Sequence, residues 1–175
     1  APRARFDRSS VNQLYKTGLM DYPPTERTKD FGVRAYTLTA STCAKTKMAS
    51  YRMSMKVHGR SGGRSAVNAA AYRHAEKLYS PDLGKNVSYT DKQGVVHSRI
   101  LAPKWAPEWV YDRQKLWGST EENESRKDAQ LFRECQVNLP VELSKEQQVE
   151  LLEGWVEEQF VGKGMIADIA IHHDS

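Results

Sequence analysis

Two side chains in this chain of 175 residues could act on a phosphodiester: a tyrosine, Tyr72, and a histidine, His172. Tyr72 follows three alanines in the run NAAAYRHAEK, and these small neighbours leave room for a large substrate to approach the phenol. A phenol can attack a phosphate, and an imidazole can hold a metal ion that polarises it. Simpler explanations exist, because a helical tyrosine commonly packs on a sheet and a lone histidine at a strand end commonly lies on the surface. Adjacent strand residues point to opposite faces, so His172 and His173 are not expected to bind one ion together.

The glycine-rich turn 58–64, HGRSGGR, could bind a phosphate. It brings Arg60, Arg64 and the free N–H groups of a following helix to one place. The alternative is a flexible loop with solubilising arginines. The turn is neither a Walker loop nor a GxGxxG motif, and the chain contains neither HExxH nor GxSxG. A kinase, a zinc protease or a serine hydrolase therefore has no support in the sequence.

A third candidate for chemistry is Glu134, in the run RECQVNLP just before a predicted strand. A carboxylate at this place could orient a histidine or accept a proton. The alternative is a surface charge that pairs with Arg133 or Arg126.

The charge of the chain is distributed unevenly, although the net charge is only +4. Residues 1–47 carry 9 Lys/Arg against 4 Asp/Glu, residues 48–100 carry 9 against 3, and residues 101–175 carry 8 against 15. The basic part includes the glycine-rich turn, and such a distribution suits a polyanion such as nucleic acid. Solvated charged faces on each half would explain the same counts.

The cysteines and the apolar runs favour a cytoplasmic protein that does not insert into a membrane. Cys43 and Cys135 are far apart and no CxxC occurs, so a thiolate zinc site or a disulfide framework is not expected. The apolar runs are far too short to span a bilayer.

The elements that would position these residues can be read from the pattern along the chain. Residues 1–47 show no useful periodicity, so we expect the folded unit to begin near Met48. The segment before it would be a poorly ordered, dispensable extension, which is either a native tail or upstream sequence attached by a wrong start. The predicted elements are strand 51–57 with its odd-numbered residues buried, helix 66–79 capped by Ser65, a hairpin of strands 87–90 and 95–101, helices 108–117 and 121–131, strand 135–139, helix 145–161 capped by Ser144, and strand 165–172. Together they predict an α+β fold with a mainly antiparallel sheet flanked by helices.

Several long runs in the correct order give the chain a family resemblance. They are SMKVHGRSGGRSAVNAAAYRHAEKL, GVVHSRILAPKWAPEW, ESRKDAQLFRECQVNLPVELSKEQQVEL and QFVGKGMIADIAIH. Over residues 48–175 the chain resembles the N-terminal relaxase domain of the MobA/MobL plasmid mobilization proteins. The resemblance implies an HUH-type endonuclease fold, incomplete at the C-terminus.

The resemblance also implies a reaction. Tyr72 would attack one phosphodiester of single-stranded or melted DNA at the plasmid origin of transfer, which leaves a 5′-phosphotyrosyl link and a free 3′-hydroxyl. Glu134 would be a catalytic carboxylate, and Gln136 stands where relatives often carry a second acid. Arg60, Arg64 and Arg73 would contact the DNA. Accessory mobilization and coupling proteins would be partners in conjugation.

A divalent cation, Mg²⁺ or Mn²⁺, is implied as well, held by three histidines. His172 would be the first, and the other two belong to an N-P-H-x-H run that would follow Ser175. With one of the three, we expect this chain to cleave little by itself. A non-catalytic module that binds origin DNA is therefore the alternative. A rolling-circle replication initiator is less favoured, because its histidine pair usually precedes the tyrosine.

Overall fold

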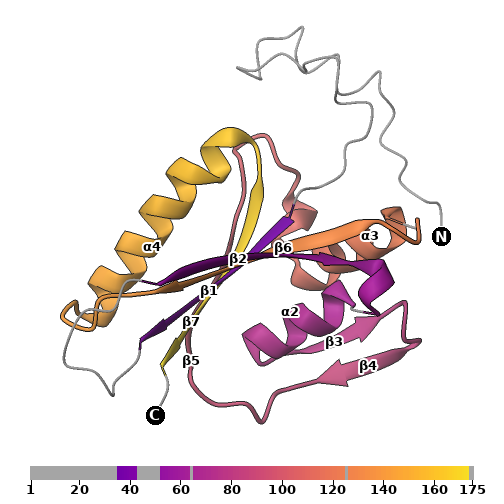
Figure 1. Ribbon diagram of the computed structural model, residues 1–175, viewed down its shortest axis with the longest axis horizontal. Coiled ribbons are helices and arrows are strands. Elements are labelled where there is room, and N and C mark those ends of the chain that lie inside the picture. Colours follow the sequence, from indigo (N-terminus) through magenta and orange to yellow (C-terminus); the bar gives the residue numbers. More distant parts are fainter. Residues whose placement is uncertain (1–34, 43–51, 64, 125, 174–175) are drawn as a thin grey trace, which may run out of the picture. The chain divides into compact units, whose positions relative to one another are not determined.

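The computed structural model describes residues 35–42, 52–63, 65–124 and 126–173. Five strands form one sheet in the order β2-β6-β1-β7-β5, and two more form a separate hairpin, β3-β4. Helices α2 and α3 and the hairpin lie on one face of the sheet, and α4 lies on the other (Figure 1). The elements are β1 (Ala35–Thr42), β2 (Met53–Gly59), η1 (Arg60–Gly62), α2 (Ala66–His74), β3 (Lys77–Ser80), β4 (Lys85–Ser88), β5 (Val95–Leu101), η2 (Glu108–Tyr111), α3 (Arg113–Asn123), β6 (Gln130–Asn138), α4 (Lys145–Gln159), η3 (Val161–Lys163) and β7 (Ile166–His173).

The central strand, β1, corrects the prediction that the folded unit begins near Met48. It pairs in parallel with both β6 and β7, and its Leu38 and Ala40 are completely buried. A strand covered on both faces needs neither large side chains nor alternation, so its sequence AYTLTAST resembles that of a linker. The rest of the predicted extension, residues 1–34 and 43–47, lies outside the described residues.

The sheet is mixed rather than mainly antiparallel. The outer pairs β2-β6 and β5-β7 are antiparallel, whereas both central pairs are parallel because β1 runs in the same direction as its neighbours. The α+β class with helices on the faces of the sheet agrees with the prediction.

The predicted hairpin of strands 87–90 and 95–101 is wrong, because β4 pairs with β3 and β5 pairs with β7. The cause is an early end to α2. Ala75 adopts a left-handed conformation (φ 55°) and its N–H bonds to Ala71 O, so a strand begins where the sequence predicted a helix to residue 79. An alanine in this conformation carries no glycine signal. The predicted helices 108–117 and 121–131 are also wrong, because the structure has the short η2 at Glu108–Tyr111 and a single helix α3 at Arg113–Asn123. Strand β6 then begins at Gln130 and places Leu131 and Phe132 in the core.

The apolar side of β2 was predicted to be buried and is exposed instead. Met53, Met55 and Val57 are each about half exposed. The reason is the position of β2 at the edge of the sheet, where alternation alone cannot tell which side is covered.

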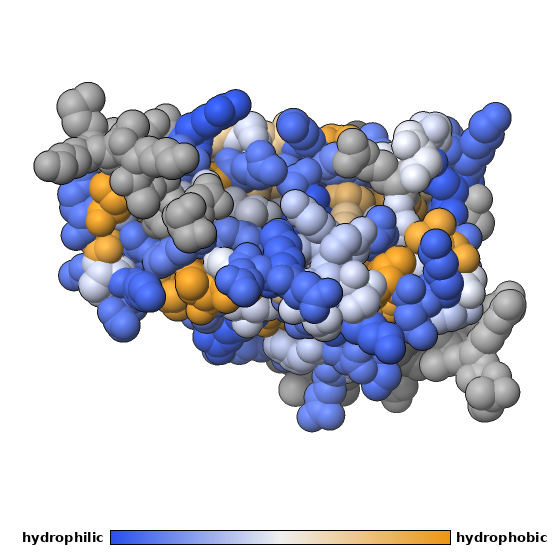
Figure 2. Space-filling view, turned by 90° about the horizontal axis from the view of Figure 1, so that it is seen from below, coloured by the Kyte–Doolittle hydropathy of each residue, from blue (hydrophilic) through white to orange (hydrophobic). Residues whose placement is uncertain are grey.

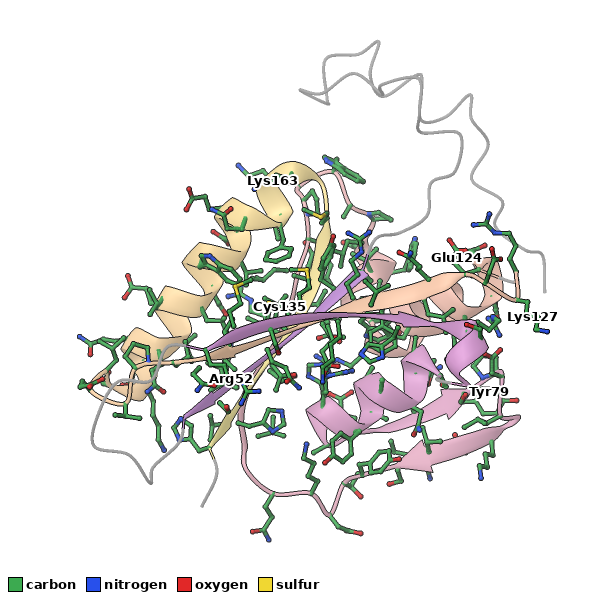
Figure 3. The ribbon with its side chains drawn as sticks, in the orientation of Figure 1. Arg52, Tyr79, Glu124, Lys127, Cys135 and Lys163 are labelled. Atoms are coloured by element: carbon green, nitrogen blue, oxygen red, sulfur yellow. The ribbon has the colours of Figure 1, made fainter. Side chains whose placement is uncertain are left out.

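Two apolar cores fasten the elements to the sheet. One lies against α2 and α3 and includes Val67, Trp117 and Phe132. The other lies against α4, where Cys135 of β6 is completely buried (Figure 3). The predicted cap of α4 is confirmed, because the side chains of Ser144 and Gln147 form a capping box. In the part of the chain that the structure describes, no helix is long and apolar enough to cross a membrane.

Candidate active site

The strand register decides which candidate residues share a face of the sheet. Glu134 of β6, Thr37 of β1 and Asp168 of β7 form one row, and His172 lies four residues beyond Asp168 on the same face. The Cα atoms of Glu134 and His172 are two strand spacings apart across the sheet and four residues apart along it, which corresponds to a distance of about 16 Å. That distance is too long for the Glu134 carboxylate to orient the His172 ring by a direct hydrogen bond, although both face the α2 side.

Glu134 is held by three side chains inside the protein. His58 Nε2 lies 2.8 Å from one carboxylate oxygen, and Arg73 Nη2 lies 2.7 Å from the other, which also accepts a 3.2 Å hydrogen bond from Gln136 Nε2. The alternative partners Arg133 and Arg126 are therefore not those of the structure. Burial acts to raise the pKa of Glu134, but the hydrogen bonds and charges of Arg73 and His58 outweigh it and hold this pKa below its usual value. A carboxylate of this kind is ionised at neutral pH and is a weak base.

Arg73, predicted to contact DNA, lies inside the protein rather than on its surface. It is buried, and its guanidinium packs 5.2 Å from the centre of the Phe132 ring, on which His58 also stacks. His58 was missed by the sequence analysis, which placed it in the turn. The signal was available, since His58 continues the alternation of β2 on the side that faces Glu134 of β6.

Tyr72 lies on the solvent side of α2, with 52% of its surface exposed. Its ring meets the Tyr89 ring edge-on at 5.3 Å between centroids, and Lys92 Nζ lies 3.9 Å from the centroid of the Tyr72 ring. The suggestion that this tyrosine packs on the sheet is therefore wrong. The alanines Ala70 and Ala71 are fully buried, so their small size brings α2 close to the sheet.

A buried charged group fastens α2 and α3 to β7. Both oxygens of Asp168 accept hydrogen bonds from Arg113 at 2.9 Å, and one also accepts from Trp117 Nε1 at 2.8 Å. His74 Nε2 lies 3.1 Å from the same carboxylate, and His74 Nδ1 lies 2.8 Å from Ser98 Oγ of β5. Burial opposes the charge of Asp168, but His74 and Arg113 lower its pKa to about 2. The sequence analysis noticed Asp168 only as an interruption of an apolar run.

The glycine-rich turn is occupied by groups of the protein itself. Arg60 donates from Nη2 to Glu121 O at 2.6 Å, from Nε to Glu124 O at 3.0 Å, and from Nη1 to Asp82 at 2.7 Å. Figure 3 shows Glu124 at the end of α3, where free carbonyls attract a cation. At the start of α2, Glu121 Oε1 accepts from Val67 N at 3.1 Å. A protein carboxylate therefore holds part of the position proposed for a phosphate. Arg64 lies outside the described residues.

This arrangement predicts a structural effect for Arg60. Arg60→Ala removes two charged hydrogen bonds to carbonyls at the end of α3 and one to Asp82, and should lower the free energy of unfolding by about 2 kcal/mol. Arg126→Ala is the matched control, because its side chain is 74% exposed and its partner Glu124 is 3.7 Å away. The control should change the free energy by about 0.5 kcal/mol or less. Urea denaturation followed by circular dichroism measures both, and equal effects would contradict the assigned capping role.

The expected metal site rests on His172, which the structure places near the end of β7 as a buried residue. Within residues 35–42, 52–63, 65–124 and 126–173, no group of three His, Cys, Asp or Glu side chains is arranged to hold a metal ion. The described residues alone thus do not complete a site for the cation.

The chain belongs to the MobA/MobL family, whose family model matches residues 64–175. The chain is 38% identical over 137 residues to the conjugal transfer protein TraA of Rhizobium radiobacter, which covers 73% of this chain and 12% of TraA. It is 38% identical over 125 residues to the mobilization protein MobL of Acidithiobacillus ferridurans, which covers 71% of this chain and 32% of MobL. The chain thus spans well under half the length of either relative.

The fold is similar to that of a solved structure from work on the molecular basis of vancomycin resistance transfer in Staphylococcus aureus. The TM-score is 0.65 at 30% sequence identity, over 69% of this chain and 61% of the other. The likeness therefore extends over most of the chain.

Proposed function

We propose that this chain is part of a relaxase of the HUH-endonuclease type, which nicks one DNA strand at a plasmid origin of transfer and keeps the 5′ end on Tyr72. The observation that carries the proposal is the placement of Tyr72. Its side chain is half exposed on α2. Two residues further along the same helix, His74 contacts Asp168 and so fastens α2 to β7, the strand that ends at His172 and His173. Family membership supports it, because the relatives are named for mobilization and conjugal transfer.

The proposed step is a transesterification. The phenolic oxygen of Tyr72 forms a bond to phosphorus while the bond from phosphorus to the 3′-oxygen breaks. The phenol loses its proton to solvent, and the departing 3′-oxygen takes one up. One phosphodiester is exchanged for another, so the strand can be rejoined by the reverse reaction. This chemistry needs an accessible phenol on a fixed helix, and α2 provides one.

The surface near Tyr72 suits a nucleic acid. Figure 2 views the protein from the side of the β3-β4 hairpin, and this face is mostly hydrophilic with small, separate apolar patches. Beyond the row of Glu134, the α2 side of the sheet continues with polar residues, among them Thr39, Ser41 and the exposed Gln136. A single strand needs such a polar surface together with aromatic rings for unstacked bases.

A divalent cation, Mg²⁺ or Mn²⁺, belongs to the proposal. His172 would supply one imidazole nitrogen, and the ion would draw charge from the phosphate that is attacked. The remaining ligands would come from residues other than those described. In this proposal Glu134 is a positioning residue. Its carboxylate fixes Arg73, which is next to Tyr72 in sequence, and His58, which lies on the neighbouring strand β2.

Arg64 allows a test of DNA binding without cleavage. If Arg64 contacts a phosphate, Arg64→Ala should weaken binding evenly across DNA sequences and reduce the slope of log K against log salt by about one. Fluorescence anisotropy with two unrelated single-stranded oligonucleotides at several salt concentrations measures this. A loss confined to one of the two sequences would reject the phosphate contact.

The proposed function itself is tested by looking for a covalent complex. The full-length gene product is incubated with a single-stranded oligonucleotide from the origin of transfer and Mg²⁺ or Mn²⁺, then separated under denaturing conditions. An oligonucleotide labelled at its 3′ end should give a labelled DNA–protein adduct, and one labelled at its 5′ end should give a free, shorter fragment that ends in a 3′-hydroxyl. Binding without any adduct would favour the alternative, a module that holds origin DNA and does not cut it.

A further inference from the structure

The connection between β4 and β5, residues 89–94, lies against the exposed side of α2. The Tyr89 ring contacts the Tyr72 ring, and the Tyr89 hydroxyl donates to Asn68 Oδ1 at 3.0 Å. Within the connection, Lys92 N donates to Tyr89 O at 2.9 Å and closes a turn. These contacts hold the connection in place beside the candidate nucleophile.

Lys92 keeps a positive charge on the face of the Tyr72 ring. Its Nζ lies 3.9 Å from the ring centroid and donates to Tyr72 O at 3.1 Å. The ammonium sits on a flexible stem, so rotation of the side chain can bring it to an oxygen near the phenol.

The same connection is tied to the end of β7. Gly94 O accepts a 2.9 Å hydrogen bond from His173 N, and a Cβ at Gly94, whose φ is +92°, would lie only 3.0 Å from His173 O. Lys92 is two residues before Gly94, so its backbone lies between the Tyr72 side of α2 and the strand end that carries His172. Figure 1 shows this connection running from the hairpin to the start of β5, beside the end of β7.

We infer that Lys92 contacts the phosphate that Tyr72 attacks, a role that rests on the function proposed above. As the bond from the Tyr72 oxygen to phosphorus forms and the bond to the 3′-oxygen breaks, negative charge is redistributed over the phosphate oxygens and the 3′-oxygen. A cation beside the phenol stabilises that charge. Lys92 stays protonated throughout and transfers no proton. Its ligand is one non-bridging oxygen of a DNA phosphodiester.

A simpler account of Lys92 exists, in which its stem and ammonium only pack on an aromatic ring. That account predicts effects on stability that depend on the side chain's shape and hydrogen bond. It does not predict a reaction rate that depends on charge. Lys92→Gln keeps a hydrogen-bond donor and removes the charge, whereas Lys92→Arg keeps the charge, so the pair separates the two accounts.

The test uses the full-length gene product and measures the rate constant of adduct formation at saturating oligonucleotide. Lys92→Gln should lower this rate constant about tenfold to a hundredfold. Lys92→Arg should recover most of the loss. Lys85→Gln, the same change at an exposed lysine on β4, is the matched control and should leave the rate unchanged. With a methylphosphonate at the scissile position, which lacks one anionic oxygen, the ratio of wild-type to Lys92→Gln rates should shrink toward one.

The outcomes separate this inference from the proposed function. If the wild-type protein forms an adduct and Lys92→Gln forms it at the same rate, only the role of Lys92 is overturned. Lys92→Arg reacting as slowly as Lys92→Gln also overturns it, because the rate would then not depend on charge. A wild-type protein that forms no adduct refutes the proposed function, and the role of Lys92 falls with it.

Discussion

Asp168→Asn is expected to lower the free energy of unfolding at neutral pH by about 3–5 kcal/mol, the cost of breaking a buried ion pair. The side chain of Asp168 has no exposed surface, and Arg113, Trp117 and His74 all lie against its carboxylate. An asparagine keeps the size but presents an amide group where these donors need an acceptor. The Arg113 guanidinium would then be left with Glu76, its other acidic partner, and with Ser98. Because these residues join α2, α3, β5 and β7, the whole α2 side of the sheet should loosen.

The stability that Asp168 contributes should also depend on pH in a defined direction. The folded-state pKa of Asp168 is lowered from 3.8 to about 2, so its contribution to stability is fully present above pH 3.8 and is lost as the pH falls toward 2 and below. The difference in stability between wild type and Asp168→Asn should therefore narrow by about 2 kcal/mol over that range.

Denaturation in urea at a series of pH values measures both effects. Asp128→Asn is the matched control, because Asp128 is exposed and the same change there should have an effect of about 0.5 kcal/mol or less. A loss of less than 1 kcal/mol for Asp168→Asn at pH 7, or a difference that grows in acid, would contradict the anchoring role of this carboxylate.

Tyr72→Phe is expected to abolish the DNA adduct while leaving the fold and DNA binding intact. The substitution removes only the phenolic oxygen, and the ring can keep its contacts with Tyr89 and Lys92. If the phenol is the nucleophile, no other group replaces it, so the adduct should fall to background.

A second exposed tyrosine provides the control for this change. Tyr79→Phe makes the same change on β3, where the side chain is 48% exposed, and should leave adduct formation unchanged. Gel analysis under denaturing conditions follows the adduct, and anisotropy confirms binding. An adduct that persists in Tyr72→Phe would reject the assignment.

The sequence was a good guide where local signals act alone. Ser144 and Gln147 predict the start of α4, and the apolar run that ends at His172 predicts β7, because capping and periodicity are properties of a few neighbouring residues. The sequence failed where long-range pairing decides. Thr37–Thr42 contains too few large apolar residues to predict a strand, yet β6 and β7 pair with its two edges and hold it at the centre of the sheet.

The candidate site shows the same division. Tyr72, Glu134 and His172 were visible as residue types in a suggestive order, but their partners were not. His58 lies 76 positions from Glu134, and His74 lies far along the chain from Asp168, so neither pair has a sequence spacing that could reveal it. Arg60 and Arg73 looked like surface cations because charge composition carries no information on what the folded chain places beside them.

The most direct test of the central claim is to identify the residue that carries the DNA. The adduct formed by the full-length gene product is digested with trypsin and nuclease, and the peptide that retains a nucleotide is sequenced by mass spectrometry. The account predicts that the modified peptide contains Tyr72, in the run SAVNAAAYR that begins after Arg64 and ends at Arg73. A nucleotide on Tyr51, Tyr79 or Tyr89 would contradict it.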